Sequence, residues 1–410
     1  MVAERDRTLM SQRLLHTPEG VRDIYGKEYE EKLYVERQLK DCIHLYGYRD
    51  IQTPTFEFFD VFSREIGTTP SKELYKFFDK DGNTLVLRPD FTPSIARCAA
   101  KYFSEERHPL RFSYIGNTFT NTSNLQGKLK EVTQLGAELI GDPSVEADAE
   151  IISMVIRALL GAGLKRFQVA IGDAEYFKGL CEEAGLDEDT ELELRSFISG
   201  KNYFGAQELL TERNVAEPYR SRLLKVADIF GDMGSLAEAG AMAENVRSLA
   251  AIRRLERLYS LLELYGVESH VSFDLGMLSK YRYYTGTIFK AYTYGVGEAI
   301  VKGGRYDRLL LQFGKDAPAV GFVIVVDSIM EALSRQDAKL PAPEEVRQIF
   351  YTAEDFAEKL ATAQRLRREG TAAVLLPMEC ASSMEDSREE GHSSEGEHSR
   401  QEEHSREGGR

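Results

Sequence analysis

The stretch YIGNTFTNTSNLQGKLKEVTQLGAELIG, residues 114–141, places a polar loop between two strand-forming segments. Ser113–Phe119 and Val132–Ile140 favour extended backbone, and we expect them to form paired strands. The loop that joins them carries no charged side chain over residues 119–127. The stretch therefore predicts a strand pair, and the function of the protein depends on what its polar loop faces.

Helix and strand signals alternate along the chain around this strand pair. Residues 27–47 place apolar side chains at helical spacing and end at a glycine, which is a common helix terminator. Residues 48–58 favour a strand that Pro54 interrupts, and Asp81-Gly82 predicts a hairpin turn between two β-rich runs. We expect two further helices in this part of the chain, over residues 92–103 and 144–163.

The composition changes between about Asp173 and Gly266, where Leu, Ala, Glu and Arg recur at helical spacing. We expect residues 173–266 to be a helical insertion, after which strands return and a buried strand runs into a helix at 317–333. Helices beside largely antiparallel strands predict an α+β core over residues 1–172 and 267–335. A β-α-β fragment at 344–377 resembles the start of an α/β domain, and we expect the polar residues 378–410 to be a disordered tail.

Composition argues against several classes of protein. The 410 residues are 42% hydrophobic, contain no run of 18 apolar residues and begin without a charged and apolar leader. We therefore expect a soluble, cytoplasmic protein with no membrane partner. The net charge of −15 argues against broad nucleic-acid binding. Cys42, Cys98, Cys181 and Cys380 form no CxxC pair, so we expect reduced thiols and no metal site.

Five separate segments resemble the histidyl-tRNA synthetases, in the order in which that family has them. They are LRPDFTPSIAR at residues 87–97, the strand pair and its loop at 114–141, YYTGTIFKAY at 283–292, GGRYDRLL at 303–310 and AVGFVIVVDSI at 319–329. The resemblance extends from about Thr17 to Leu333 and implies the class II synthetase fold. It also implies a six- or seven-stranded antiparallel sheet and a dimer built around the first long helix and the Pro54 strand.

The resemblance also implies a histidine pocket. Asp90 and Thr92 would face the α-amino group, although the family usually has Glu at the first of these positions. The other implied pocket residues are Gln134 and Glu138 at the floor, Tyr283 and Tyr284 on the imidazole side, and Gly303, Gly304 and Tyr306 in the remaining wall. These types suit the ligand, because an ammonium favours carboxylates and an imidazole needs a donor and an acceptor. Each residue alone has an ordinary structural explanation, such as a helix cap at Asp90, so only the set favours the pocket.

Four positions depart from the synthetase pattern, and the resemblance assigns all four to the ATP site. Thr120 and Thr122 occupy the places of the arginine that holds the α-phosphate and the glutamate that contacts adenine. Ser328 and Ser279 replace two further arginines. A hydroxyl does not substitute for a guanidinium at a phosphate, and losing one preorganised transition-state donor costs about 10²–10³ in rate. Unless the alignment is offset by a residue, adenylate formation is lost.

A kept histidine pocket beside a lost ATP site resembles a second family, the regulatory subunits of ATP phosphoribosyltransferase. In that family the subunit is non-catalytic and uses no cofactor. It assembles with a short-form catalytic subunit, as a homodimer within a hetero-oligomer, and supports the first step of histidine biosynthesis and its feedback inhibition by histidine. The resemblance thus implies histidine as ligand and no nucleic acid. Two alternatives stay open, an active histidyl-tRNA synthetase with an atypical ATP site and a synthetase-like tRNA-sensing module.

Overall fold

The computed structural model describes residues 15–63, 69–122, 128–278, 284–342 and 346–379. The chain divides into two compact units, Met1–Leu340 and Pro341–Arg410. Within the described ranges, no helix is both long and apolar enough to cross a membrane. The tail predicted over residues 378–410 lies outside the described residues from position 380 onward.

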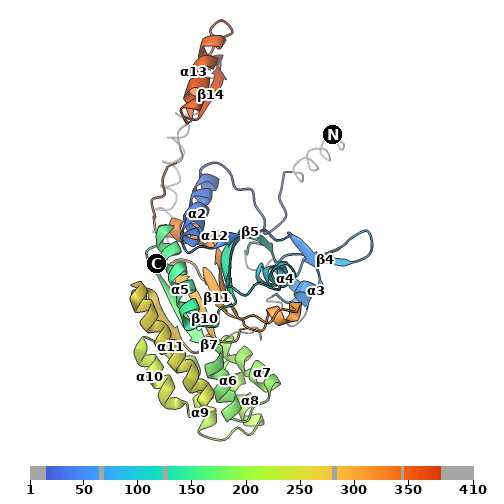
Figure 1. Cartoon of the computed structure of the whole chain (residues 1–410), viewed down its shortest axis with the longest axis vertical. Coiled ribbons are helices and arrows are strands. Elements are labelled where there is room, and N and C mark those ends of the chain that lie inside the picture. Colours follow the sequence, from blue (N-terminus) through green and yellow to red (C-terminus); the bar gives the residue numbers. More distant parts are fainter. Residues whose placement is uncertain (1–14, 64–68, 123–127, 279–283, 343–345, 380–410) are drawn as a thin grey trace, which may run out of the picture. The chain divides into compact units, whose positions relative to one another are not determined.

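A nine-stranded sheet forms the centre of the larger unit (Figure 1). From one edge to the other its strands are β1 (Arg49–Asp50), β5 (Leu110–Phe119), β6 (Glu131–Ile140), β12 (Ala319–Val325), β11 (Val301–Arg305), β10 (Thr287–Thr293), β7 (Phe167–Asp173), β9 (Val271–Asp274) and β8 (Phe230–Gly231). The predicted strand pair is confirmed, because β5 and β6 pair antiparallel from Leu110 opposite Ile140 to Phe119 opposite Glu131. The α+β class is confirmed as well.

The sheet is larger and more mixed than the six or seven antiparallel strands that the resemblance implied. β1 pairs parallel with β5, and β9 pairs parallel with β7. Long connections that contain helices join the strands of both pairs, and parallel neighbours need such a crossover. The antiparallel expectation therefore holds for the strands from β5 to β7 and is wrong for β1 and β9.

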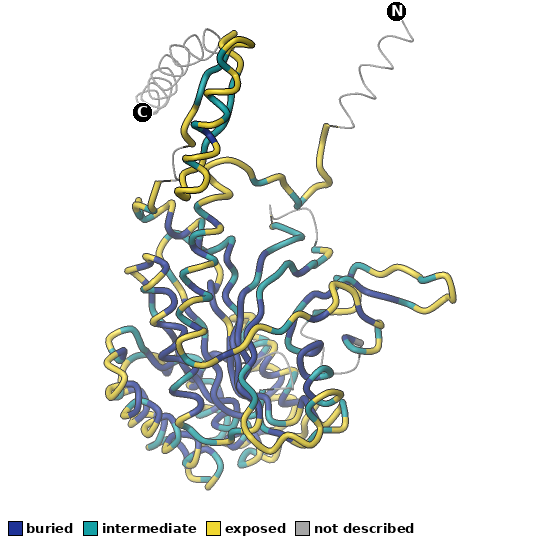
Figure 2. Tube along the Cα trace, turned by 45° about the horizontal axis from the view of Figure 1, so that its top comes forward, coloured by how far each residue is buried: buried dark blue, intermediate teal, exposed yellow. Residues whose placement is uncertain are grey.

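Three helices pack together on one face of this sheet: α2 (Gly26–Leu45), α5 (Val145–Gly161) and α12 (Val326–Arg335). Their buried side chains share one hydrophobic core with Leu135, Ala137 and Leu139 of β6. The Ser144 hydroxyl begins α5 by accepting a hydrogen bond from the Ala147 N–H at 3.2 Å. In Figure 2 the middle strands are buried over most of their length. The helices thus occupy the face toward which alternate residues of β6 point.

The opposite face of the sheet is polar where β6 crosses it. Because side chains alternate along a strand, Gln134 and Glu138 point away from the helices that cover Leu135 and Ala137. The predicted helix at 92–103 is present as α4 (Thr92–Tyr102), and it packs on this second face. The second face therefore combines buried packing under α4 with the polar side chains of Gln134 and Glu138.

A small three-stranded sheet has the order β2 (Phe56–Phe58), β4 (Thr84–Leu87), β3 (Lys76–Phe78). β3 and β4 form the predicted hairpin, in which Gly82 has a φ of 84°. The segment 48–58, expected as one interrupted strand, divides at Pro54 between the two sheets, because proline lacks the N–H that a ladder needs. Short helices follow β2, namely α3 (Asp60–Ser63) and the 3-10 turn η1 (Ser71–Glu73).

The segment between β7 and β9 is almost entirely helical (Figure 1). Its elements are α6 (Ala174–Glu183), α7 (Glu188–Ser199), α8 (Tyr203–Glu212), α9 (Tyr219–Lys225), η3 (Val226–Asp228), α10 (Met233–Met242), α11 (Val246–Tyr265) and η4 (Glu268–His270). Side chains of Asp173, Asp187, Asn202, Asp232 and Asn245 accept backbone hydrogen bonds at the starts of five of these helices. Local capping thus helps to set where these five helices begin.

The end of the chain shows the two strand-and-helix patterns that the sequence predicts. In the larger unit, β12 runs directly into α12, with only the 3-10 turn η5 (Leu310–Phe313) between β11 and β12. The smaller unit is a β-α-β unit of β13 (Arg347–Tyr351), α13 (Phe356–Arg368) and β14 (Ala373–Pro377). Its two strands pair in parallel, as this connection requires.

Candidate ligand-binding site

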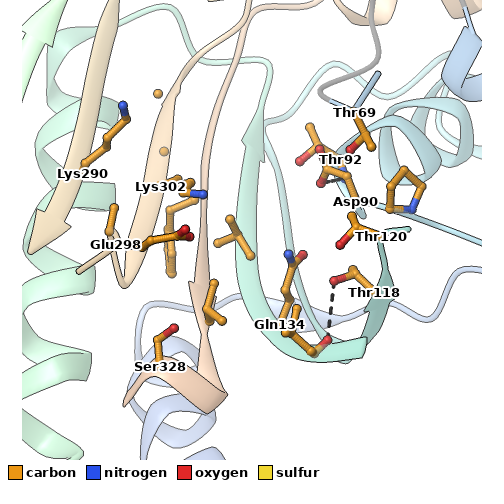
Figure 3. A pocket seen from close by; sticks show the side chains of 18 of the residues that line it. Thr69, Asp90, Thr92, Thr118, Thr120, Gln134, Lys290, Glu298, Lys302 and Ser328 are labelled. Atoms are coloured by element: carbon orange, nitrogen blue, oxygen red, sulfur yellow. Dashed lines mark hydrogen bonds between the residues drawn. The ribbon is translucent and has the colours of Figure 1, made fainter. Parts of the chain in front are cut away.

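A cavity of about 830 Å³ opens on the polar face of the large sheet (Figure 3). Its floor consists of residues that share this face in neighbouring strands, namely Gln134, Glu138, Gly321, Gly304 and Ile288. The start of α4 and the segment before it supply one wall. A cavity of this size is larger than one amino acid needs and is typical of small-molecule sites.

Glu138 lies at this floor and is only 1% exposed. Its Oε1 accepts a hydrogen bond from Thr92 Oγ1 at 2.8 Å and a longer one from the Tyr114 hydroxyl at 3.4 Å. The Tyr306 hydroxyl donates to Oε2. Within the described residues all its partners are hydroxyls and none is a basic side chain. Among the described residues, the carboxyl is therefore held by hydroxyls with no basic side chain hydrogen-bonded to it.

This environment changes the proton affinity of the buried groups. Burial raises the pKa of Glu138 to about 8, although the bonds from Tyr306 and Thr92 oppose the shift. Burial first, and then the Glu138 charge, raise the pKa values of Tyr306 and Tyr114 well above their usual range. Because a buried charge without a counter-charge is unfavourable, the Glu138 carboxylate favours a ligand that brings N–H donors or positive charge.

Asp90 and Thr92 flank the start of α4, where the Thr92 N–H donates to Asp90 Oδ1 at 3.1 Å. Arg88 fixes the segment before them, because its Nε donates to the Asn117 carbonyl at 2.8 Å. Gln134 extends into the cavity in Figure 3, and its Oε1 accepts no hydrogen bond within the described residues. An acceptor that is buried and unsatisfied favours a ligand with a donor at this point.

Glycines bring the cavity groups directly onto the sheet backbone. A Cβ added at Gly321 would lie 1.6 Å from Glu138 Oε2, and one at Gly304 would lie 2.6 Å from the Tyr284 ring. No larger residue permits such approaches, so the shape of this floor depends on glycine at these positions.

The wall that carries Tyr306 is fixed by a buried ion pair. Arg305 is 2% exposed, and its Nε and Nη2 donate to Asp148 Oδ1 at 2.9 and 2.6 Å. Asp148 of α5 is fully buried, and its other oxygen accepts from Arg254 of α11 at 2.6 Å and from Thr287 of β10 at 3.0 Å. One carboxylate thus joins β11, β10, α5 and α11 behind the cavity.

The cavity has two chemically different parts. We call Asp90, Thr92, Gln134, Glu138 and Tyr306 the Glu138 half of the lining residues, and Thr120, Thr122, Glu298, Lys302 and Ser328 the Ser328 half, a division by the kind of residue and not by its place in the cavity. Two of these groups show the character of the Ser328 half. The Thr122 hydroxyl is buried without a hydrogen-bond partner in the described residues, and Glu298 pairs with an exposed lysine, Lys128. The Ser328 half therefore holds few fixed polar contacts.

Every predicted site residue that the structure describes lines this one cavity. These are Asp90, Thr92, Gln134, Glu138, Tyr284, Gly303, Gly304 and Tyr306 of the predicted pocket, and Thr120, Thr122 and Ser328 of the predicted former ATP site. Tyr283 and Ser279 lie outside the described residues. The structure thus brings together segments that are more than 200 residues apart, from Asp90 to Ser328.

Sequence reasoning missed several residues of the site. Tyr114 touches Glu138 but reads as an ordinary strand residue, and Gly321 sits in a segment whose other residues are apolar. Thr118, which is 2% exposed, lines the cavity without any distinguishing pattern. The alternation of side chains along β5 and β12, opposite Gln134 and Glu138, is the one signal that selects them once the strand register is known.

Comparison with known proteins agrees with the family that the sequence motifs predict. The family model for histidyl-tRNA synthetase matches residues 20–329. An ATP phosphoribosyltransferase regulatory subunit from Acetivibrio thermocellus is 40% identical over 363 residues, covering 88% of this chain and 87% of the relative. The chain belongs to the family of ATP phosphoribosyltransferase regulatory subunits. A further member, from Clostridium kluyveri, is 37% identical and covers 92% of this chain and 96% of the relative.

Solved structures agree with this regulatory-subunit family. A Bacillus halodurans protein described as an ATP phosphoribosyltransferase regulatory subunit/histidyl-tRNA synthetase has a TM-score of 0.81 at 35% identity, covering 89% of this chain and 93% of that one. The histidyl-tRNA synthetase of Nostoc sp. PCC 7120 has a TM-score of 0.74 at 18% identity, covering 88% and 86%, and so shares the fold. The predicted family and the class II synthetase-like fold are confirmed.

Proposed function

We propose that this chain is a cytoplasmic, non-catalytic regulatory subunit that binds histidine in the Glu138 half of the cavity. In this role it is required by a short-form ATP phosphoribosyltransferase subunit, which carries out the first step of histidine biosynthesis, and it takes part in feedback inhibition by histidine. The observation that carries the proposal is Glu138, a carboxyl that is 1% exposed and has only hydroxyl partners among the described residues.

The polar groups of this half match free histidine in type and number. Asp90 and Thr92 are proposed to receive the α-ammonium, which favours a carboxylate acceptor. Glu138 and Gln134 offer acceptors to the imidazole N–H, and Tyr306 offers a hydroxyl that donates or accepts. Tyr284, and Tyr283 beside it in the sequence, are proposed to lie against the ring. Gly303 and Gly304 would complete the wall.

We propose that the Ser328 half no longer handles ATP. Thr120, Thr122, Ser328 and Ser279 take the places that arginines and a glutamate have in the resembling synthetases. Hydroxyls there supply neither the permanent charge nor the bidentate geometry that phosphate recognition uses. Lys302 lines this half, but a lysine is a point charge on a flexible stem and does not reproduce a planar clamp. The proposal therefore excludes adenylate formation and charging of tRNA.

The proposed assembly is a homodimer within a hetero-oligomer that contains the catalytic subunit. The name of the relatives supports the catalytic partner, since they are called regulatory subunits of ATP phosphoribosyltransferase. An uncovered apolar face supports the homodimer. On the small sheet, Phe56, Phe58 and Phe77 share one side by strand register and are 52%, 56% and 37% exposed. We propose that a second copy of this chain covers them.

The same proposal gives a domain plan. A synthetase-like core is formed by residues 1–172 and 267–335, and residues 173–266 are inserted between two of its strands. Residues 344–377 form a partial α/β domain. The connection from β7 to the parallel strand β9 through several helices supports this division, because the helices lie between two strands of one sheet.

Three measurements test the function. Calorimetry with histidine is expected to give saturable binding at one site per chain. Histidine-dependent exchange between ATP and pyrophosphate is expected to be absent, and appreciable exchange would instead support an active synthetase. Mixing with a short-form ATP phosphoribosyltransferase is expected to give a complex whose activity histidine inhibits. Absence of both histidine binding and complex formation would refute the proposal.

A further inference from the structure

A lysine lies in the buried stripe of α2, at a position where packing favours an apolar side chain. Lys32 is 7% exposed and shares this stripe with Val35, Leu39 and Ile43. Lysine is almost never buried unless its charge is paired. Its ammonium must therefore have partners that compensate for the loss of water.

Those partners come from two other elements. Lys32 Nζ donates to Asp327 Oδ1 at 2.9 Å and to Thr133 Oγ1 at 2.8 Å. Asp327 Oδ2 in turn accepts from the Thr133 N–H at 2.6 Å, which closes a triangle. We call Lys32, Thr133 and Asp327 the Lys32 triad. Each member belongs to a different element, since Lys32 is in α2, Thr133 in β6 and Asp327 in the first turn of α12.

The triad lies where the β6–β12 ladder ends. The last paired residues are Val325 and Gln134, because α12 begins at the next residue, Val326. The N–H of Thr133, one position beyond the ladder, would be left without a strand partner. The Asp327 carboxylate accepts that N–H, as every buried backbone donor requires an acceptor. Asp327 thus continues the hydrogen bonding of the sheet by one residue.

Two neighbours of the triad line the cavity. Gln134 follows Thr133 directly, and Ser328 follows Asp327 directly; Asp327 itself also lines the cavity. Lys32 does not line it. The lysine therefore holds two cavity segments, one from β6 and one from α12, from the helix-covered side of the sheet.

We propose that Lys32 is a positioning residue of the cavity: through Asp327 and Thr133 it fixes the backbone from which Gln134 and Ser328 enter the site. The choice of histidine as probe rests on the function proposed above, whereas the geometry of the triad does not. Without the ammonium, the Asp327 carboxylate loses its counter-charge in a nearly dry setting, where its side chain is 11% exposed. It then turns toward water and releases Thr133.

Hydrogen exchange in the ligand-free protein tests the first step. Lys32→Met keeps the apolar stem and removes the ammonium. The Thr133 amide is expected to exchange at least about tenfold faster in this variant, because its acceptor has been released. Lys32→Gln retains one donor, is the variant to use if Lys32→Met does not fold, and is expected to accelerate exchange as well. Arg222→Met is the matched control, since it breaks a half-buried ion pair with Glu183 away from the cavity.

Histidine affinity tests the second step. Its dissociation constant is expected to rise about tenfold in Lys32→Met and to stay within about twofold in Arg222→Met. Unchanged exchange at Thr133 overturns the proposal, and so does faster exchange with unchanged histidine affinity. If the unmodified protein binds no histidine, the proposed function fails instead, while the exchange measurement still decides whether the triad fixes this backbone.

Discussion

The two halves of the cavity differ in how firmly their polar groups are held. In the Glu138 half, one carboxyl that is 1% exposed receives hydrogen bonds from Thr92, Tyr114 and Tyr306. In the Ser328 half, the Thr122 hydroxyl has no partner in the described residues, and the Lys128–Glu298 pair has side chains that are 45% and 59% exposed. The Glu138 carboxyl is therefore held by three hydroxyls, whereas Glu298 makes an ion pair that is largely exposed to solvent.

This difference supports the proposal that the ligand binds at the Glu138 half. A buried carboxyl held by hydroxyls is unfavourable for the free protein, because desolvation of its charge is only partly offset. Such an arrangement persists where a ligand uses it. An exposed ion pair costs little and also contributes little. The physical chemistry therefore separates a maintained site from a part of the cavity that tolerates change.

The largest expected effect comes from breaking an ion pair near each half, Arg305–Asp148 for the Glu138 half and Lys128–Glu298 for the Ser328 half. Arg305→Met is expected to lower the free energy of unfolding by about 3–5 kcal/mol, because it removes one of the two arginines that neutralise the fully buried Asp148 carboxylate. Lys128→Met, which breaks the exposed pair of the Ser328 half, is expected to cost about 0–1 kcal/mol. Urea unfolding measures both. Equal losses would contradict the distinction between the two halves.

The next effect is a pH dependence of stability that belongs to Glu138. Its pKa is raised from 4.5 to about 8 on folding, so the folded protein binds the proton more tightly than the unfolded chain. Protonated Glu138 contributes fully to the free energy of unfolding below pH 4.5. This contribution is lost as the pH rises through about 8. Glu138→Gln is expected to reduce the fall in unfolding free energy between about pH 5 and about pH 8 by about 2–4 kcal/mol.

Because Asp173 also titrates in this range, the pH dependence of unfolding must be compared between the unmodified protein and Glu138→Gln. Burial raises the pKa of Asp173 to about 7, so it adds its own loss of stability over the same range. Urea unfolding at both pH values, in the unmodified protein and in Glu138→Gln, isolates the Glu138 contribution because Asp173 is common to both. Parallel pH profiles would show that Glu138 is not protonated in the folded protein.

The third effect is on histidine binding. Glu138→Gln keeps the shape of the side chain but cannot become a carboxylate when a cationic ligand binds, and a hydrogen bond to a charged group contributes about 1.5–3 kcal/mol. We expect histidine affinity to fall by about 10- to 100-fold in calorimetry. Thr120→Val, a change of similar size in the Ser328 half, is expected to alter it by less than about twofold. A larger effect from Thr120→Val would reverse the assignment of the two halves.

The smallest effect is a gain of nucleotide binding in the Ser328 half. Thr120→Arg combined with Ser328→Arg places two guanidinium groups at cavity-lining positions that the proposed function assigns to a former ATP site. We expect ATP affinity to rise by about tenfold over the unmodified protein, as phosphate favours planar bidentate donors. The control carries glutamine at both positions, which adds similar length without charge. Equal affinities in the two variants would show that this half has lost more than its arginines.

Much of the fold was predictable from local signals in the sequence. The β5–β6 pair, the β3–β4 hairpin and helices α2, α4 and α5 lie where alternation, Asp81-Gly82 and helical spacing predicted them. The parallel edge pairs were not predictable in this way, because they join segments far apart in the chain. Pro54 signalled an interruption, but no local property states that the two sides enter different sheets.

The sequence predicted residues that line the cavity, but not their hydrogen-bond partners or pKa values. Motif order predicted Glu138 at the pocket floor, whereas its raised pKa comes from a burial that the hydroxyls of residues 306, 92 and 114 oppose only in part. Lys32 is missed for a related reason. A lysine in an amphipathic helix predicts a surface position, and only the fold reveals Asp327, 295 residues away, as its partner.

Gly321 offers geneticists a way to separate sensing from assembly. It lies under Glu138 within the sheet, and a single methyl group there would occupy the place of the Glu138 carboxyl oxygen. A cell that carries Gly321→Ala would keep every polar residue of the protein and the outer surface offered to other subunits. Under the proposed function, its histidine production is expected to continue while histidine accumulates, which gives a growth phenotype without loss of the pathway.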